Sequence, residues 1–395
     1  MNEMLTKLAS ESGGPFFFYD LNRLSSQLKN LQANQFDGLK IWYATKANPL
    51  SDIIRLVREA GFGIDVASMG ELAHAQKQGF VGNNIIATGP AKSRNYLTTL
   101  LHNDVSTIVC ESLNQLLWLN EIAGEMDRTV KVLLRVQLDW EEGSSVLGGN
   151  AVTPFGIEPD QWRSVHPDNF PHLDILGFHV FQWGNILDLQ RLDDIWRQIA
   201  RQLLMLGEEI GVSVQVLDLG GGLGIPYTET EQGLNFDDVS GLLWCLKTDF
   251  DIPEIWLELG RYLVGECGYY ATEIIDRKTV RGKELLVTAG GINHIARPAL
   301  TDQGFPCQNI SQTGNTNREF QVHGPLCTAL DQLGIYELQD STEPGDWLVF
   351  SQAGAYGMTE AMPYFLCHDL PAEIISYQGK ISHKRSIEKA SSWLK

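Results

Sequence analysis

The sequence contains no apolar run of about 18 residues, which is the length that a transmembrane helix needs. Its first 14 residues are mixed polar and small, without the apolar core of a signal peptide. Basic residues are scarce: 30 lysines and arginines stand against 49 acidic residues, giving a formal net charge of −19. This charge argues against nucleic acid or an anionic membrane as a partner, but it leaves room for a local basic pocket.

Cysteine is also sparse and shows no pattern. The six cysteines form neither a CxxC pair nor a zinc spacing. We therefore expect a reduced, cytoplasmic protein without a metal site, in which most thiols are buried. The chain lacks internal repeats, low-complexity tracts and long linkers. With 395 residues, 43% of them hydrophobic and 20% charged, it predicts a soluble protein of two domains.

Apolar runs alternate with amphipathic stretches from about residue 25 to residue 270. Two of these stretches, 51–60 and 187–210, have helical periodicity. Strands that alternate with helices predict an α/β fold, a (β/α)8 TIM-like barrel, with a doubly wound open sheet as the alternative. The predicted strands are 40–45, 63–67, 85–89, 106–111, 130–136, 176–181, 214–220 and 255–260.

The sequence changes in character after about residue 270. Short apolar runs separated by Gly/Pro turns predict strands at 284–288, 319–322, 346–351 and 372–377. We expect a C-terminal all-β domain, a β-sandwich or barrel, that also takes the strand-like run 16–19. The expected division is a barrel of residues 25–270 and a β domain of residues 1–24 and 271–395.

Polar side chains follow the predicted barrel strands at their carboxyl ends, where barrels of this type hold their active sites. Lys46 comes directly after the first strand. A desolvated lysine can lose its proton near neutral pH and attack a carbonyl. The structural alternative is a strand-end lysine that extends to water. The other strand-end groups are Asp65, Ser68 with Glu71, Lys92, Arg135, His179, Gln182 and Asn185.

The last two predicted barrel strands run into a glycine cluster and an acidic motif. Gly220, Gly221 and Gly222 expose backbone N–H groups that suit a phosphate, although glycine turns after strands are common. Arg261 offers a bidentate phosphate partner or, alternatively, an ordinary ion pair. Glu258 at a buried strand end needs a cation, and a protonated pyridine nitrogen would serve. Together with a lysine for an aldehyde, these groups describe pyridoxal 5′-phosphate.

With these motifs the sequence resembles the fold-type III pyridoxal-phosphate enzymes, which are alanine racemase-like barrels, and in particular the diaminopimelate/ornithine/arginine decarboxylase family. The resemblance covers essentially the whole chain. Its motifs are Tyr43-Ala-Thr-Lys46-Ala-Asn-Pro, Asp65-Val-Ala-Ser-Met-Gly-Glu71-Leu, Leu217-Asp-Leu-Gly-Gly-Gly, Glu258-Leu-Gly-Arg261, Gly324-Pro-Leu-Cys327 and Gly354-Ala-Tyr356-Gly.

The resemblance implies a role for each matching residue. Lys46 would carry the cofactor aldehyde, and Glu258 would pair with the pyridine nitrogen. Cys327 would enter from the other subunit of a head-to-tail homodimer and protonate the carbanion after loss of carbon dioxide. Arg297 would meet a substrate carboxylate. The implied cofactor-binding set is Lys46, Asp65, Arg135, His179, Phe181, Gly220, Gly221, Gly222, Glu258, Gly260, Arg261 and Tyr356.

Structural alternatives stand beside three of these roles. Without the resemblance, Cys327 would be a buried small hydrophobic residue, Tyr356 a loop tyrosine and Arg297 a surface arginine. The ring-stacking residue is also open, because counting from Gly177 places Phe181 where the family has a histidine, with His179 two residues earlier.

The departures from the family pattern concern the substrate. The residue after the loop cysteine is typically acidic and helps to bind a distal ammonium, but here it is Thr328. A site without that carboxylate would desolvate a cation at a cost of several kcal/mol. Pro154 stands where a lysine usually pairs across the dimer with the aspartate that matches Asp331. That ion pair cannot form here, although the dimer is still expected.

These features predict a pyridoxal-phosphate decarboxylase for an L-amino acid with a non-cationic distal group. The variations resemble a branch that acts on citryl-linked amino acids in siderophore assembly or on aminoacyl groups held by carrier proteins. Arg297, Thr328 and Asp331 would face the substrate. Segment 143–152 would border a wider entrance or, alternatively, form a flexible surface loop. The alternatives are a diaminopimelate, ornithine or lysine decarboxylase, an amino acid racemase and a non-catalytic regulatory homologue.

Overall fold

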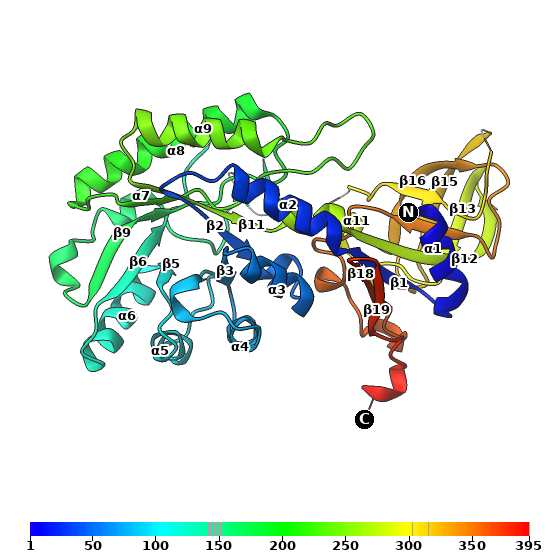
Figure 1. Ribbon diagram of the computed structural model, residues 1–395, viewed down its shortest axis with the longest axis horizontal. Helices are drawn as coiled ribbons and strands as arrows, with labels where there is room; N and C mark the ends of the chain where they lie inside the picture. Colours follow the sequence, from blue (N-terminus) through cyan, green and yellow to red (C-terminus); the bar gives the residue numbers. More distant parts are fainter. Residues whose placement is uncertain (141–143, 146–147, 150–151, 302, 315, 395) are drawn as a thin grey trace. The chain divides into compact units, whose positions relative to one another are not determined.

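The computed structural model describes residues 1–140, 144–145, 148–149, 152–301, 303–314 and 316–394 (Figure 1). These residues form two compact units, each with its own core. The barrel unit comprises residues 27–225 and 232–263, and the β unit comprises residues 1–26, 226–231 and 264–395. Segment 143–152, predicted to border the substrate entrance, lies partly outside the described residues.

The barrel unit contains a closed ring of eight parallel strands, which confirms the predicted barrel and excludes the open sheet. The strand order is β10-β11-β2-β3-β4-β5-β6-β9, so the first, seventh and eighth barrel strands are neighbours. The strands are β2 (Leu39–Ala44), β3 (Gly63–Val66), β4 (Ile85–Ala87), β5 (Thr107–Cys110), β6 (Val130–Arg135), β9 (Leu173–His179), β10 (Val216–Asp218) and β11 (Glu254–Leu259).

Apolar periodicity and serine caps explain the helices around this ring. Helix α3 (Ser51–Glu59) buries Ile53, Ile54, Leu56 and Val57 on the face that the sequence predicts. Ser68, Ser93 and Ser112 each accept a hydrogen bond from a backbone N–H in the first turn of α4, α5 and α6, respectively. The other helices of the ring are α2 (Leu21–Ala33), α4 (Met69–Lys77), α5 (Arg94–His102), α6 (Leu113–Glu125), α7 (Pro159–Trp162), α8 (Leu189–Ile210), α9 (Phe236–Asp249) and α10 (Arg261–Val264).

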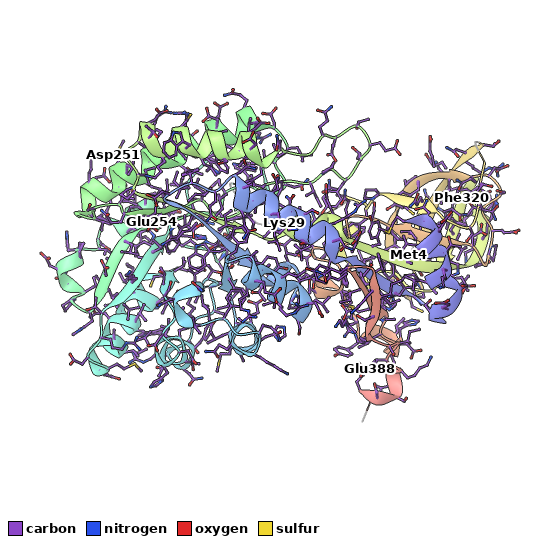
Figure 2. All side chains as sticks on the ribbon, viewed as in Figure 1. Met4, Lys29, Asp251, Glu254, Phe320 and Glu388 are labelled. Atoms are coloured by element: carbon purple, nitrogen blue, oxygen red, sulfur yellow. The ribbon has the colours of Figure 1, made fainter. Side chains whose placement is uncertain are left out.

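The two ends of the barrel differ in chemistry. Trp42 and Trp256 pack together inside the ring with their ring centroids 5.1 Å apart. Glu254, labelled in Figure 2, lies at the amino end of β11 and forms an ion pair with Lys40 at 2.8 Å. The carboxyl ends of the strands lead into the short turns that hold the predicted active-site residues. The barrel therefore holds its charged candidate site at one end of the strands.

The β unit is a nine-stranded sheet with the path β16-β15-β13-β12-β1-β18-β19, and β17 pairs with β12 and β14. Strand β1 (Phe16–Asp20) pairs with β12 and β18, which confirms that the N-terminal strand joins this domain. Phe320 on β15 is fully buried in this unit (Figure 2). The remaining elements are β12 (Gly268–Val280), β13 (Lys283–Thr288), β14 (Cys307–Asn309), β15 (Asn317–His323), β16 (Gln332–Gln339), β17 (Trp347–Phe350), β18 (Ala372–Tyr377), β19 (Lys380–Arg385), α1 (Asn2–Ser12) and α11 (Arg297–Thr301).

Four of these strands escape prediction from sequence: β12, β14, β16 and β19. Strand β12 runs on past residue 274 through positions that are mostly exposed and polar. Hydrogen bonds to β13 hold this part of the strand, so it needs no apolar alternation of its own. Among the described residues, no helix has both the length and the apolarity needed to cross a membrane.

Candidate active site

Lys46 lies in a short 3-10 turn, Thr45–Ala47, that directly follows β2. Two side-chain hydrogen bonds fix this turn: Thr45 Oγ1 donates to the Asp65 carbonyl at 2.7 Å, and Tyr43 donates to the Asn48 carbonyl at 2.7 Å. The Lys46 Nζ atom lies 3.5 Å from Asp65 Oδ2. The Lys46 side chain is 48% exposed, so burial by the protein does not desolvate it as the sequence suggests.

Asp65 is the residue before the last of β3 and is buried. Burial and the negative charge of Glu258 raise the pKa of Asp65 to about 7, while Lys46 and a hydrogen bond from Thr88 act in the opposite direction. The Thr88 hydroxyl donates to Asp65 Oδ1 at 2.7 Å. Thr88 was not predicted as a site residue, because a single threonine after a strand carries no distinctive signal. Its role depends on β3 and β4 being adjacent.

A buried charge network lies on the next strands of the barrel. Glu111 follows β5 and lies 3.1 Å from Arg135 Nη1 and 3.7 Å from Lys92 Nζ. Its second oxygen accepts the Gly156 N–H at 3.2 Å. Burial lowers the pKa of Lys92, and Glu111 opposes this shift. The sequence placed Lys92 and Arg135 at strand ends but missed Glu111, which compensates the charge of both.

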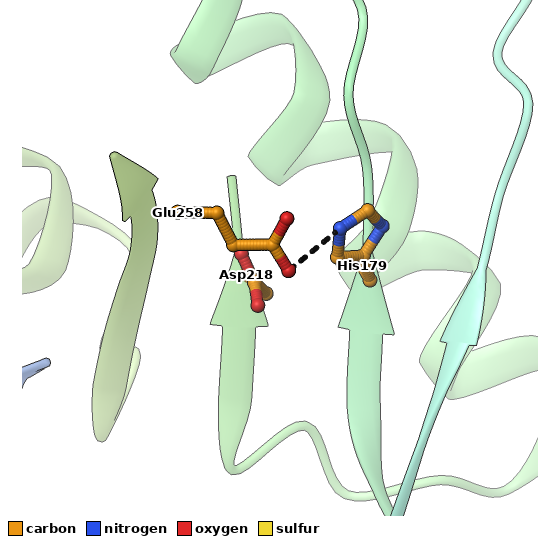
Figure 3. A group of neighbouring side chains, drawn as sticks. All are labelled: His179, Asp218 and Glu258. Carbon is orange, nitrogen blue, oxygen red and sulfur yellow. Dashed lines mark ion pairs between the residues drawn. The ribbon is translucent and has the colours of Figure 1, made fainter. Parts of the chain in front are cut away.

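His179, Asp218 and Glu258 meet inside the barrel from β9, β10 and β11 (Figure 3). The His179 Nε2 atom lies 3.2 Å from Glu258 Oε1, an ion-pair contact whose geometry is poor for a hydrogen bond. One donor atom from each of the three residues lies within 4.8 Å of the others. Three ligands are fewer than the four of a structural zinc site, and the described residues add no fourth within this distance.

The charges in this group are strongly coupled. Burial opposes ionisation of Glu258, but His179, Lys46 and Arg135 outweigh it and hold the pKa of Glu258 at about 2. Burial lowers the pKa of His179, while Glu258 acts in the opposite direction. Burial and then the charge of Glu258 raise the pKa of Asp218 well above its ordinary value. We therefore take Glu258 as ionised near neutral pH.

The turn after β10 requires glycine because neighbouring backbone atoms pack closely against it. Gly220 and Gly222 have φ angles of 64° and 102°, where other residues are strained. A Cβ atom on Gly220 would lie 2.7 Å from the Val180 carbonyl oxygen, and one on Gly221 would lie 2.6 Å from the Glu258 carbonyl oxygen. Among the described residues, no backbone hydrogen bond engages the N–H groups of Gly221 and Gly222. The turn therefore offers two donors to an anion.

Phe181 and His179 take different places around this turn. The Phe181 ring packs on the glycine turn, since a Cβ on Gly220 would lie 3.0 Å from Phe181 Cδ2. His179 instead pairs with Glu258 in the interior. Gly260 is buried, and Arg261 opens α10 directly after it. The site thus brings Arg261 to the turn that follows β11, the strand that carries Glu258.

Several polar residues at the strand ends form hydrogen bonds with backbone groups of the surrounding loops. Ser68 and Glu71 together cap α4: Ser68 Oγ accepts the Glu71 N–H at 3.1 Å, and Glu71 accepts the N–H of Ala67, the residue before the N-cap, at 2.6 Å. The Gln182 side chain donates to the Leu138 carbonyl at 3.2 Å, and Asn185 accepts the Ile225 N–H at 3.1 Å. These contacts fix the loops that border the barrel end.

The β unit holds the other predicted site residues. Arg297 is only 8% exposed, and its guanidinium carbon lies 5.6 Å from the centre of the Tyr227 ring. It is therefore not the surface arginine that the sequence offers as an alternative. Tyr356 has a φ angle of 55°, a strained conformation for a bulky residue. Such strain persists where the surrounding structure requires it, and it occurs often at functional sites.

The loop of residues 324–331, here called the cysteine loop, presents Cys327 to solvent, which excludes the buried alternative. Thr328 Oγ1 accepts the Leu330 N–H at 3.3 Å. Both Asp331 oxygens are engaged: Oδ1 accepts the Ile292 N–H at 2.8 Å, and Oδ2 accepts the Leu326 N–H at 2.7 Å. Asp331 is buried, and its two hydrogen bonds hold the cysteine loop in place.

A closed parallel barrel with these groups at one end of its strands defines a cofactor-dependent barrel enzyme. The family model of the pyridoxal-binding domain of pyridoxal-dependent decarboxylases matches residues 21–265. The chain therefore belongs to the pyridoxal-dependent decarboxylases, its cofactor is pyridoxal 5′-phosphate, and it is an amino acid decarboxylase.

Characterised relatives share about a quarter of their residues with this chain. One is a Niallia circulans decarboxylase of L-glutamyl groups on the BtrI acyl-carrier protein, 27% identical, with 95% of this chain and 91% of the relative covered. Another is a Staphylococcus aureus 2-((L-alanin-3-ylcarbamoyl)methyl)-2-hydroxybutanedioate decarboxylase, 28% identical, with 92% and 94% covered. The diaminopimelate decarboxylase of Aquifex aeolicus is 27% identical, with 97% and 91% covered.

Solved structures share the fold. A crystal structure of an Aquifex aeolicus protein matches with a TM-score of 0.86 at 25% identity, covering 98% of this chain and 92% of that one. Diaminopimelate decarboxylase from Helicobacter pylori, complexed with L-lysine, matches with a TM-score of 0.85 at 24% identity, covering 96% and 95%. Barrel and β domain are thus both features of the fold that these proteins share.

The barrel residues fit the cofactor on their own chemistry. Lys46 supplies an amine at the end of β2, and the N–H groups of Gly221 and Gly222 suit the phosphate. The Glu258 carboxylate has a buried oxygen, Oε1, without a hydrogen-bond partner among the described residues. A protonated ring nitrogen would satisfy such an atom. These three groups come from adjacent strands of the ring.

Proposed function

We propose that this enzyme decarboxylates an L-amino acid whose distal end carries no positive charge. The observation that carries this proposal is the cysteine loop. The Thr328 hydroxyl accepts a backbone N–H, and the Asp331 carboxylate is buried and occupied by two backbone N–H groups. The loop's exposed residues are Cys327, Ala329 and Leu330, so it offers no carboxylate to a distal ammonium.

Each site residue has a specific task in this proposal. Lys46 would hold the cofactor, and the glycine turn with Arg261 and Tyr356 would bind its phosphate. The cofactor withdraws electrons from the bond that breaks. The buried Glu258 carboxylate would keep the ring nitrogen protonated, and Arg297 would orient a substrate carboxylate. Cys327, exposed on its loop, would deliver a proton to the carbon that loses carbon dioxide.

Two of the relatives support a conjugated substrate. One decarboxylates an L-glutamyl group on a carrier protein, and another acts on an alanine joined through an amide to a hydroxydicarboxylic acid. In both, the distal part of the molecule is neutral or anionic. We place the present enzyme with these two, in siderophore or other secondary metabolism, and expect a citryl- or acyl-conjugated amino acid as substrate.

A carbon dioxide release screen tests the substrate class. Citryl-diaminopropionate, citryl-serine and a carrier-bound glutamyl group are expected to exceed ornithine, lysine and diaminopimelate by about 10-fold or more in kcat/KM. Thr328→Glu should reduce the ratio of these kcat/KM values, since a new carboxylate in the cysteine loop repels anions and attracts an ammonium. Ala329→Glu, which places the same charge one residue further along the loop, is the control. Efficient turnover of a free diamino acid by the wild type would refute the proposal.

We also propose a homodimer in which each active site takes the cysteine loop from the partner subunit. Lys46→Ala and Cys327→Ala are each expected to be inactive as homodimers. Mixing the two after reversible dissociation should restore activity, because some sites of the mixed dimer then contain both an intact Lys46 and an intact Cys327. If mixing restores nothing while mixed dimers demonstrably form, both residues serve the same subunit's site.

A further inference from the structure

Asp218 is a buried carboxyl group to which the proposed function assigns no role. It ends β10, its side chain is fully buried, and Oδ1 accepts the Gly220 N–H at 2.8 Å. Its other oxygen, Oδ2, has no hydrogen-bond partner among the described residues. Glu258 Oε1, on the neighbouring strand, is unpartnered in the same way. Donor atoms of these two residues and of His179 lie within 4.8 Å of one another (Figure 3).

Within the described part of the chain, no cationic side chain lies at ion-pair distance from Asp218. Lys46 pairs with Asp65, and Arg135 and Lys92 lie against Glu111. Among the residues that the structure describes, His179 on β9 is the one cationic candidate at ion-pair distance from Glu258 on β11. Two buried carboxylates therefore face a single imidazole. Two like charges in one buried site do not both ionise readily, and one carboxyl keeps its proton.

The hydrogen bonds indicate which carboxyl keeps the proton. Two ionised carboxylates are both acceptors and cannot bond to each other. An ionised Asp218 would leave Oδ2 charged, buried and unsolvated. A protonated Asp218 becomes a donor, and the Glu258 carboxylate, whose Oε1 has no hydrogen-bond partner among the described residues, brings an oxygen within 4.8 Å of it. Burial and the charges of Glu258 and Asp65 disfavour ionisation of Asp218, while the Gly220 N–H and Arg135 favour it.

We propose that Asp218 is a positioning residue that stays a neutral carboxylic acid and hydrogen-bonds Glu258 while holding the glycine turn through Gly220. Because Asp218 keeps the proton, Glu258 is the ionised member of the two carboxyl groups. The hydrogen bonds of Asp218 also fix the position of Glu258 relative to the glycine turn. The proposal rests on the assignment of Glu258 to the ring nitrogen. Asp218 thus links the two ends of the cofactor through one side chain.

Two variants separate this role from an ordinary structural one. Asp218→Asn keeps the size, an oxygen for the Gly220 N–H and a donor for Glu258, and remains neutral. We expect its cofactor dissociation constant to stay within about 3-fold of the wild type. Asp218→Ala removes both contacts, and its cofactor dissociation constant should rise by about 10-fold or more. Circular dichroism of both full-length variants checks that they fold.

The decisive readout is the pH titration of the bound cofactor's absorption spectrum. Asp218→Asn exchanges one neutral group for another. The midpoint pH of this titration should therefore be the same in the variant as in the wild type. If Asp218 were ionised, the substitution would remove a negative charge beside Glu258 and move the midpoint by about one pH unit or more. A shift of that size overturns the proposal.

Infrared spectroscopy of the full-length protein tests the proton itself, with and without cofactor. The wild type at neutral pH should show a carboxylic acid C=O band that is missing from Asp218→Asn. If the band keeps its full intensity in the variant, Asp218 is ionised and the proposal fails. Because this band does not require cofactor or turnover, its presence or absence is independent of whether the assignment of Glu258 or the proposed substrate class is correct.

Discussion

Replacing Lys46 by alanine is expected to lower kcat by about 10³-fold or more and to leave no cofactor that borohydride can fix to the protein. Lys46 lies at the end of β2 with its amine 3.5 Å from Asp65 Oδ2. Lys92, the other lysine that follows a barrel strand in the candidate site, is buried against Glu111 and the Gly89 carbonyl and cannot replace it. The measurements are steady-state carbon dioxide release and mass spectrometry of the reduced protein.

Lys40 provides the matched control for this experiment. It lies near the amino end of β2, the strand that Lys46 follows, at the opposite end of the barrel, and it pairs with Glu254. Lys40→Ala should retain the fixed cofactor and nearly all of the activity. If Lys46→Ala kept a borohydride-fixed cofactor, another lysine would hold it, and the assignment of the whole site would be wrong.

Replacing Glu258 by glutamine is expected to lower kcat by about 10²- to 10³-fold, with a smaller change in KM. The substitution keeps the size of the side chain but removes the buried negative charge that we assign to the ring nitrogen. A cofactor ring whose nitrogen is not held protonated is a weaker electron sink. The pKa of Glu258, about 2, means that the wild-type residue stays ionised over the whole range in which the enzyme can be assayed.

Glu254→Gln is the control for this second substitution, because Glu254 is the first residue of the same strand. It should cost little activity, since its ion pair with Lys40 is partly exposed and such pairs contribute about 0–1 kcal/mol. Racemisation of substrate in place of carbon dioxide release by Glu258→Gln would support the electron-sink role. Unchanged kcat in Glu258→Gln would show that the carboxylate does not face the ring.

Local sequence patterns located the residues that lie at strand ends. The run 39–44 followed by Lys46, and the run 254–259 containing Glu258, each combine a buried strand with a charged residue at its carboxyl end. In a parallel barrel those ends gather at one rim, so each strand could be interpreted without its neighbours. Serine caps and apolar helix faces act within a few residues, and they are equally visible in the sequence.

Residues whose partners lie on other strands could not be found in this way. Thr88 meets Asp65 across 23 residues of sequence, and Glu111 meets Arg135 across 24. Asp218 shares a motif with the glycines, but its unpartnered oxygen beside Glu258 follows only from the pairing of β10 with β11. A single buried polar residue has no periodicity, and its chemistry depends on what the fold places opposite it.

The sequence by itself determined the barrel, the β domain with its N-terminal strand and the pyridoxal-dependent family, because period, strand-end chemistry and short motifs are local properties. The tertiary structure decided how charge is distributed. It left Lys46 half exposed, buried Arg297 and placed Asp65, Asp218 and Glu258 within reach of one another's charges. It also turned the Asp331 carboxylate toward backbone N–H groups. Desolvation and ion pairing depend on three-dimensional neighbours, and a linear pattern does not contain them.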